Sequence, residues 1–297
     1  MKKNGVFLSL LTAGISGVSI FANALFVSRA DPLIFSLIRN SLVALMLTAV
    51  LLLFGQWKRL SRVTKKEWGI LVAIGAIGGG IPFAMFFAGL SQIGAVNGNI
   101  LQKTLFLWVA LFAVPILKEK IGKVQLLGYL FLFLGMFVFG GTYKLVPSTG
   151  AFLVLGATIL WAIENVVAKI TLKTVSPHIV AWGRMLFGLP FLLAATVVMG
   201  KTHLLMTPTA FAPMPLVVSS VLLVAYVATW YSTLSLAPAT VVSSILVFAP
   251  VVTALLTAIV LHESIVKTQA TNLILLSLGT ILVVVTRLFP KRQNRSV

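Results

Sequence analysis

Five ionisable side chains lie within long apolar runs of this sequence: Arg39, Lys103, Glu164, Lys169 and Arg184. A charge at the centre of a membrane costs about 2.5–3.5 kcal/mol on insertion scales, so such residues usually face a partner or a water-filled cavity. A cation and a carboxylate in such a place could bind a charged solute or transfer protons. We therefore treat these side chains as the candidates for chemistry.

Lys103 and Glu164 are the strongest candidates, because each falls near the middle of its apolar run. Asn99 lies about one helical turn before Lys103, and Trp161 shares a helical face with Glu164. The two charges could form a fixed ion pair, bind a zwitterionic or anionic solute between them, or include a proton-coupling Glu164. The sequence leaves these three roles open.

Aromatic side chains could complete such a site. Tyr226 and Trp230 are four residues apart on one helical face, and their polar atoms need partners when buried. Lipid contact or helix packing is the other interpretation of these aromatic residues. Lys169 stands nearer the end of its run, and we expect its side chain to extend the ammonium to the membrane surface.

Hydropathy predicts the elements that position these residues. The chain is 59% hydrophobic and 9% charged, with a mean hydropathy of +1.09, which indicates an integral membrane protein. About 20 mostly apolar residues cross the hydrocarbon layer as a helix. Ten windows of this kind are present: 5–28, 32–54, 68–90, 94–117, 122–140, 150–172, 177–199, 213–235, 237–260 and 267–288. Since they lack the alternation of barrel strands, we predict an all-α membrane protein with ten transmembrane helices.

The net charge of +18 lies mainly at the ends of these windows. If both termini are cytoplasmic, that side receives most of the cations, and the opposite side keeps only Arg29, Lys144, Lys201 and Lys267. A bias of this kind orients membrane proteins and attracts anionic lipid. We predict a multi-pass protein of the cell (inner) membrane with both termini in the cytoplasm, and no binding of nucleic acid.

The chain also repeats itself. At a spacing of 145 residues Arg39 matches Arg184, and at 144 residues Glu119 matches Glu263. Further matched pairs are Gly5/Gly150, Pro32/Pro177, Ala95/Ala239, Leu117/Leu261 and Lys123/Lys267. We predict two five-helix repeats, residues 1–145 and 146–297. Because five is odd, the second repeat must enter the membrane from the opposite side, and inverted repeats of this kind are common in secondary transporters.

The repeat separates the charges into two groups. Arg39 and Arg184 are matched, which favours a structural or gating role for both. Glu164 instead corresponds to Ser19, and Lys103 corresponds to a valine. The scaffold does not require these two charges, so they are better candidates for contact with a solute or proton.

Several windows contain residues that weaken helices. Gly78, Gly79 and Gly80 precede Pro82, and further prolines lie inside other windows at Pro115, Pro190 and Pro250. Such residues remove side chains or backbone donors and can kink a helix. We regard them as candidate hinges, although close packing of small residues explains the glycines equally well.

The order of these motifs resembles one known family. Pro-x6-Arg opens the second and seventh windows, and Leu-x-Glu closes the fourth and ninth (Leu117–Glu119 and Leu261–Glu263). With the two five-helix repeats, this pattern resembles the EamA-type transporters of the drug/metabolite transporter superfamily. The resemblance implies a ten-helix fold and the import or export of small metabolites such as amino acids. One difference is Gly14-Ile-Ser-Gly17 in the first window, where many relatives have a Trp-Gly pair.

Other functions lack the residues they need. The chain has no cysteine, its three histidines lie at or beyond window ends, and no glycine-rich phosphate loop is present. We therefore predict no enzyme, no metal site and no cofactor. The prediction is an alternating-access secondary transporter, as monomer or homodimer, for a small polar or zwitterionic metabolite, with an amino acid first and proton coupling as an option. The alternatives are a lipid or lipid-phosphate flippase and a multidrug or organic-cation exporter.

Overall fold

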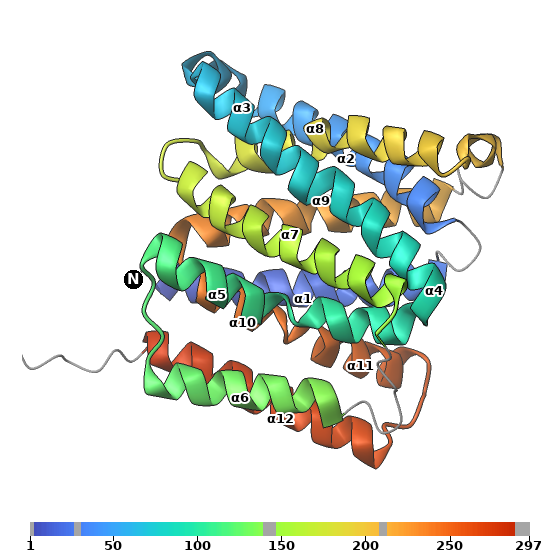
Figure 1. Cartoon of the computed structure of the whole chain (residues 1–297). Coiled ribbons are helices and arrows are strands. Elements are labelled where there is room, and N and C mark those ends of the chain that lie inside the picture. Colours follow the sequence, from blue (N-terminus) through green and yellow to red (C-terminus); the bar gives the residue numbers. More distant parts are fainter. Residues whose placement is uncertain (1–2, 27–30, 139–146, 208–212, 289–297) are drawn as a thin grey trace, which may run out of the picture.

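The computed structural model describes residues 3–26, 31–138, 147–207 and 213–288, and within these ranges every regular element is a helix (Figure 1). The elements are α1 (Lys3–Phe26), α2 (Pro32–Leu53), η1 (Gln56–Arg62), α3 (Lys65–Ile74), η2 (Gly75–Gly80), α4 (Ile81–Lys103), α5 (Leu105–Leu117), α6 (Lys123–Val138), α7 (Thr149–Thr171), α8 (Pro177–Val198), η3 (Thr202–Met206), α9 (Pro213–Leu236), α10 (Ala239–Leu246), α11 (Ala249–Val260) and α12 (Lys267–Leu288). The matched prolines Pro32 and Pro177 each begin a helix, where a missing backbone N–H costs nothing.

The chain is an all-helical membrane protein. Its described part contains nine helical stretches that are long and apolar enough to cross a membrane, and a shorter apolar helix at Lys123–Met136. These ten stretches fall at the ten windows that hydropathy predicts. Large apolar side chains point outward along them, including Phe7, which is 71% exposed, and Val198, which is 86% exposed. Such exposure is expected of side chains that contact lipid.

Three of the predicted windows are not continuous helices, and here the prediction was wrong in detail. The third is interrupted by the π-helix η2, just before Pro82. The fourth is interrupted at Thr104, and the ninth at Val247 and Phe248, just before Pro250. A proline cannot donate to the carbonyl four residues before it, which explains the first and third interruptions. Gly94, at φ 77°, also breaks the helical geometry within α4.

The helices lie roughly side by side in the bundle, with α6 against α12 at one edge and α2, α3 and α8 at the other (Figure 1). Buried apolar side chains form one large group among α2, α3, α5, α7, α8, α9 and α10, and a second among α1, α5, α6, α10, α11 and α12. Helices α5 and α10 contribute side chains to both groups, so the two cores meet along them.

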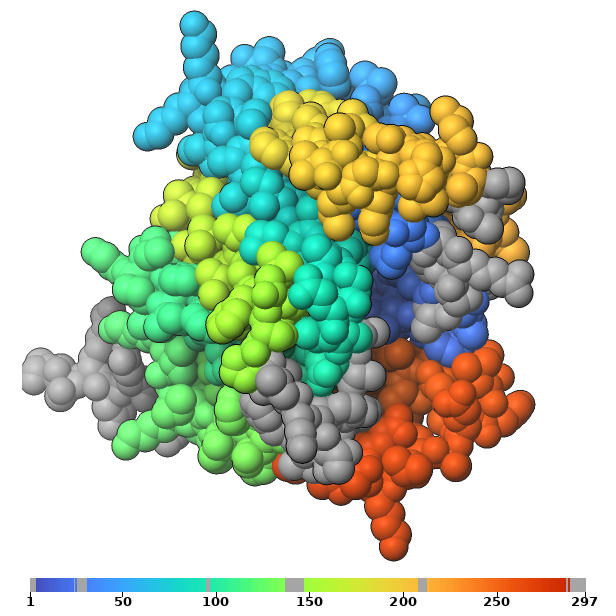
Figure 2. Space-filling view, turned by 45° about the vertical axis from the view of Figure 1, so that its right-hand side comes forward, coloured from blue at the N-terminus to red at the C-terminus, as the bar shows by residue number. Residues whose placement is uncertain are grey.

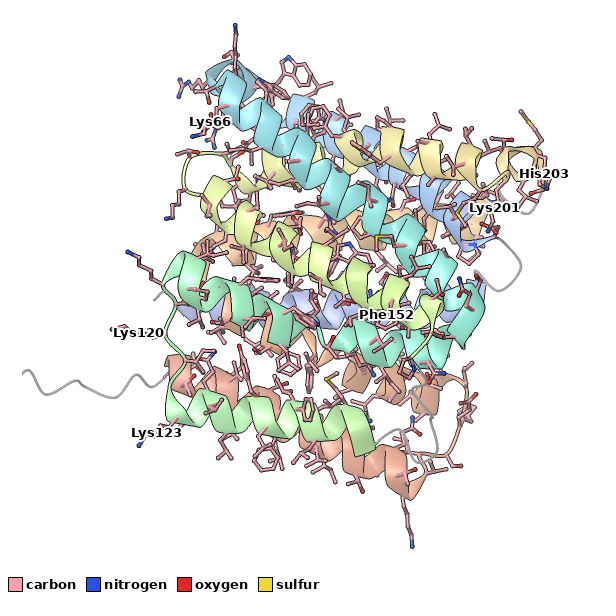
Figure 3. All side chains as sticks on the ribbon, in the orientation of Figure 1. Lys66, Lys120, Lys123, Phe152, Lys201 and His203 are labelled. Carbon is pink, nitrogen blue, oxygen red and sulfur yellow. The ribbon has the colours of Figure 1, made fainter. Side chains whose placement is uncertain are left out.

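Charged residues collect at the two ends of the bundle. Lys66, Lys120 and Lys123 lie at one end, and Lys201 and His203 lie at the other (Figure 3). We call the first end the Glu119 face and the second the Glu263 face, after the acidic residue in a loop at each end. Several other cations of the predicted charge bias, including Arg29, Lys144 and those that follow residue 288, lie outside the described residues.

One ion pair ties two helix ends together at the Glu263 face. Asp31 caps α2 by accepting hydrogen bonds from the backbone N–H groups of Leu33 and Ile34, and Lys201 Nζ lies 2.7 Å from its other oxygen. Burial acts to raise the pKa of Asp31, but these hydrogen bonds outweigh it, so the pKa lies below its usual value. The carboxylate therefore fastens the start of α2 to the segment that follows α8.

Candidate functional site

A cavity of 580 Å³ lies where the two cores meet. Four of the five buried charges of the sequence line it, Lys169 being the exception, together with the predicted partners Asn99, Trp161, Tyr226 and Trp230; the four charges are Arg39, Lys103, Glu164 and Arg184. These side chains come from α2, α4, α7, α8 and α9. The structure thus brings the predicted residues into one place, and their individual roles stay predictions.

The backbone carbonyl of Gly78 organises one wall of this cavity. In a regular helix this carbonyl would accept a bond from residue 82, but Pro82 has no N–H. The Gly78 oxygen instead accepts hydrogen bonds from Trp161 Nε1 and Arg184 Nη2, each 3.0 Å long. The π-helix η2 therefore supplies a backbone acceptor inside the membrane, as such irregular turns often do at functional sites.

Glu164 is held in the same wall and is only 1% exposed. Its carboxylate accepts a 2.5 Å hydrogen bond from the hydroxyl of Tyr231, which is fully buried. Arg184 lies close enough to attract this carboxylate electrostatically. A Cβ added to Gly78 would lie 2.6 Å from Glu164 Cγ and 3.1 Å from Arg184 Nε, so the close approach of the three residues depends on this glycine.

Aromatic rings continue the wall. Trp230 Nε1 donates to Asn165 Oδ1 at 3.1 Å, and Asn165 Nδ2 donates to the carbonyl of Trp161 at 2.8 Å. The rings of Tyr226 and Trp230 are stacked with centroids 6.0 Å apart, and Phe86 packs against Trp161. The polar atoms of both tryptophans are therefore satisfied within the protein, and their ring surfaces face the cavity.

Two cations approach from other helices. Lys103 is the last residue of α4, directly before the break at Thr104, so the interruption of the fourth span lies beside the cavity. Arg39, on α2, is partly buried, and its guanidinium lies 5.8 Å from the centre of the Phe35 ring. The cavity is thus lined by three basic side chains and one carboxylate, Glu164.

The Glu119 face is closed by a carboxylate that the sequence placed only at a span end. Glu119 Oε1 accepts from the backbone N–H of Ala239 at 2.7 Å, and Oε2 accepts from the backbone N–H and the hydroxyl of Thr240 at 3.0 and 2.7 Å. The carboxylate thereby caps the first turn of α10, where unpaired N–H groups attract an anion. The repeated Leu-x-Glu motif was the available signal for this residue.

Lys169 reinforces this closure by binding protein carbonyls at a helix end, a contact that the sequence did not predict. Its Nζ donates to the carbonyls of Leu234 at 2.5 Å and Ala237 at 2.8 Å, at the end of α9, and Glu119 lies near enough to attract it. Carbonyls at a helix end have no partners within the helix, so they bind a nearby cation well. The role of Tyr231 was also missed, although Trp230-Tyr231 matches Phe86-Phe87 of the first repeat at the spacing of 144 residues.

The equivalent residue at the opposite end, Glu263, is exposed. The residues before the two glutamates, Lys118 and His262, both have φ 55°, so the chain leaves the fourth and ninth spans in the same way. No hydrogen bond or ion pair joins the Glu263 carboxylate to another residue in the described part of the chain. One member of the matched pair is therefore docked on a helix and the other is not.

The cavity extends toward the Glu263 face. Its lining includes Thr257 near the end of α11 and Gln269 and Asn272 near the start of α12, and these helix ends flank the Glu263 loop. Figure 2, which brings this side of the molecule forward, shows the surface hollowed where the dark blue of α1 meets the orange of the C-terminal helices. The interior is thus closer to this face than to the capped Glu119 face.

Comparisons with known proteins agree with this architecture. The model of the EamA-like transporter family matches twice, at residues 3–141 and 148–285. An uncharacterized transporter in the cobO 3' region of a Sinorhizobium species is 24% identical over 135 residues, which cover 46% of this chain and 95% of that protein. The uncharacterized transporter YyaM of Bacillus subtilis (strain 168) is 28% identical over 189 residues, 60% of each chain. One crystal structure shares the fold with a TM-score of 0.72 and 15% identity, covering 96% of both chains.

Gly78→Ala tests the geometry of the glutamate wall. The added methyl group would overlap Glu164 Cγ, and overpacking of this kind costs about 1–3 kcal/mol. We expect the variant to unfold at a lower temperature than the wild-type protein when unfolding in detergent is measured by tryptophan fluorescence. Gly69→Ala is the matched control, because no atom lies within 4 Å of its added Cβ and alanine favours a helix. Equal unfolding temperatures for the two variants would contradict the assigned packing.

Proposed function

Because the chain belongs to the EamA-like transporter family and is a membrane transporter, we propose that it is a secondary active carrier that moves a small polar metabolite by alternating access. Amino acids are the first substrate class, since the cavity offers cations, one carboxylate and aromatic surfaces together. The carrier lies in the cell membrane with both termini in the cytoplasm. Each predicted repeat, 1–145 and 146–297, contributes one half.

The observation that carries this proposal is the unequal closure of the two faces. The cavity reaches toward the Glu263 face, whereas on the other face Glu119, after α5, and Lys169, on α7, bind the junction between α9 and α10. A carrier must close one end while the other is open, and two similar halves of inverted orientation can exchange these roles.

The repeat indicates how the exchange occurs. Ala239, which is capped by Glu119, corresponds to Ala95, the residue that follows the non-helical Gly94 in α4. In the opposite state, the Glu263 carboxylate accepts hydrogen bonds from the backbone N–H groups after Gly94, and Glu119 releases α10. The two carboxylates then act as alternating latches, one for each face.

The site residues divide the work. Lys103 and Asn99 form hydrogen bonds with polar groups of the solute, and the rings of Trp161, Tyr226 and Trp230 shield the rest from lipid and water. Glu164 is enclosed by Tyr231 and Arg184, so it takes up and releases the coupled proton and does not contact the solute directly. Arg184 positions Glu164 through the Gly78 carbonyl.

Amino-acid uptake into proteoliposomes tests these roles. We expect Lys103→Gln to reduce both net uptake and exchange about 10- to 100-fold, because a hydrogen bond to a charged group contributes about 1.5–3 kcal/mol. Glu164→Gln should abolish accumulation driven by a proton gradient and retain exchange of solute across the membrane.

Lys173→Gln, an exposed substitution outside the cavity, is the control for loss of a positive charge. Uptake, exchange and proton-driven accumulation at control levels in both site variants would refute the assignment. Transfer of fluorescent lipid without any amino-acid exchange would instead favour a flippase.

Single cysteine reporters test the latches, because the chain has no native cysteine. Ser244→Cys reports on the Glu119 face, since Ser244 is fully buried in α10 beyond the capped turn. A membrane-impermeant maleimide is applied from that face. We expect Glu119→Gln to increase labelling at least fivefold and Glu263→Gln to decrease it. About 1 kcal/mol of differential stabilisation changes the ratio of two conformational states by this factor.

Lys267→Gln is the control, because it changes the charge at the same mouth as Glu263 and leaves both carboxylates intact. If the Glu263→Gln variant is labelled to the same extent as this control, Glu263 does not latch the Glu263 face.

A further inference from the structure

Arg39 and Arg184 occupy matched positions in the two repeats, yet their surroundings differ. Near Arg184, on α8, the facing residue of α7 is Glu164, and η2 of the third span contacts both helices. In the first half, the position equivalent to Glu164 is Ser19 on α1, which lines the same cavity as Arg39 on α2, and α9 of the eighth span contacts both helices. The two halves thus share the same helix arrangement around an arginine, but only one of them supplies a carboxylate.

The compensation of the two charges differs accordingly. Arg184 donates to the Gly78 carbonyl and is attracted by Glu164. Arg39 makes no hydrogen bond or ion pair with any residue in the described part of the chain, whereas the Nε atoms of both arginines are buried without a partner. The Arg39 guanidinium makes a cation–π contact with the ring of Phe35. A guanidinium inside a membrane is costly unless something compensates the charge, so a missing partner indicates a place for one.

The place beside Arg39 is accessible. Arg39 and Ser19 both line the 580 Å³ cavity, which extends toward the Glu263 face. Neither residue is fully buried, so a solute entering from that face can reach both side chains. The planar fork of an arginine binds a carboxylate through two parallel hydrogen bonds, and the serine hydroxyl can donate a third.

We propose that Arg39 binds the carboxylate of the transported solute. In the first repeat, this carboxylate lies beside Arg39 and Ser19 as the Glu164 carboxylate lies beside Arg184 in the second repeat. This inference rests on the proposed carrier function and deepens it by naming the charged group that the solute must carry. The fixed carboxylate of one half is thereby replaced in the other half by a carboxylate that arrives and leaves. Arg39 then selects anionic and zwitterionic solutes over purely cationic ones.

Ser19→Glu tests the missing partner without any solute. A glutamate at this position recreates the arrangement of the second half, so we expect the solute-free protein to unfold several degrees above Ser19→Gln, which has the same size and no charge. The gain should disappear in the Arg39→Gln background, as a double-mutant cycle requires. Ser19→Asp repeats the measurement with a shorter side chain. A gain that persists without Arg39, or no gain from either acid, overturns the assignment.

A thermal-shift screen then tests the ligand, using L-amino acids, their carboxamides and inorganic phosphate as probes. A ligand that binds the folded state raises its unfolding temperature. We expect amino acids to stabilise the wild-type protein, their carboxamides to have little effect, and both Ser19→Glu and Arg39→Gln to remove the shift. Equal shifts from acids and carboxamides, or a shift from phosphate alone, would overturn the carboxylate assignment.

The outcomes separate this inference from the proposed function. The carrier function would be contradicted if the double-mutant cycle shows the expected coupling between residues 19 and 39, but transport is absent and cysteine labelling does not change. Normal transport and labelling without that coupling would count against Arg39 alone.

Discussion

Arg184 can remain in the interior of a membrane protein because the Gly78 carbonyl accepts its hydrogen bond and the Glu164 carboxylate, which Tyr231 holds in place, attracts its charge. This arrangement begins with Pro82, which leaves the Gly78 carbonyl without a partner in its own helix. The freed carbonyl binds α7 through Trp161 and α8 through Arg184, and the absence of a Cβ at Gly78 lets both helices approach. The position of the aromatic wall, and with it the shape of the cavity, follows from this constraint.

The two repeats keep the same scaffold and differ at its centre. The Leu-x-Glu turns at Lys118 and His262 have the same φ of 55°, which agrees with the proposal that the two faces close in the same way. Glu164 has no acidic counterpart in the first repeat. In the proposed carrier, the duplication supplies two equivalent gates, whereas the binding of one solute needs an unsymmetrical centre, so the differences between the halves are the more informative part of the sequence.

Hydropathy and internal repetition predicted the spans, and the costs of buried charge and polar aromatic groups predicted which residues share the cavity. These signals succeed because the membrane imposes the same constraint on each helix separately. They did not reveal that Lys169 binds the end of α9 or that Tyr231 binds Glu164, since such contacts depend on how distant helices meet. The break at Thr104 was missed because no proline follows to mark it, whereas the break at Val247 and Phe248 lies just before Pro250, which the sequence marked as a candidate hinge.

The structure of this protein with a transported amino acid bound, determined by crystallography or electron microscopy, tests the central claim most directly. We expect the solute carboxylate within hydrogen-bonding distance of the Arg39 guanidinium, while Arg184 remains on the Gly78 carbonyl and Glu164 on Tyr231. A solute whose carboxylate binds Arg184 in place of Glu164, with Arg39 left unoccupied, would contradict the division of roles between the two arginines.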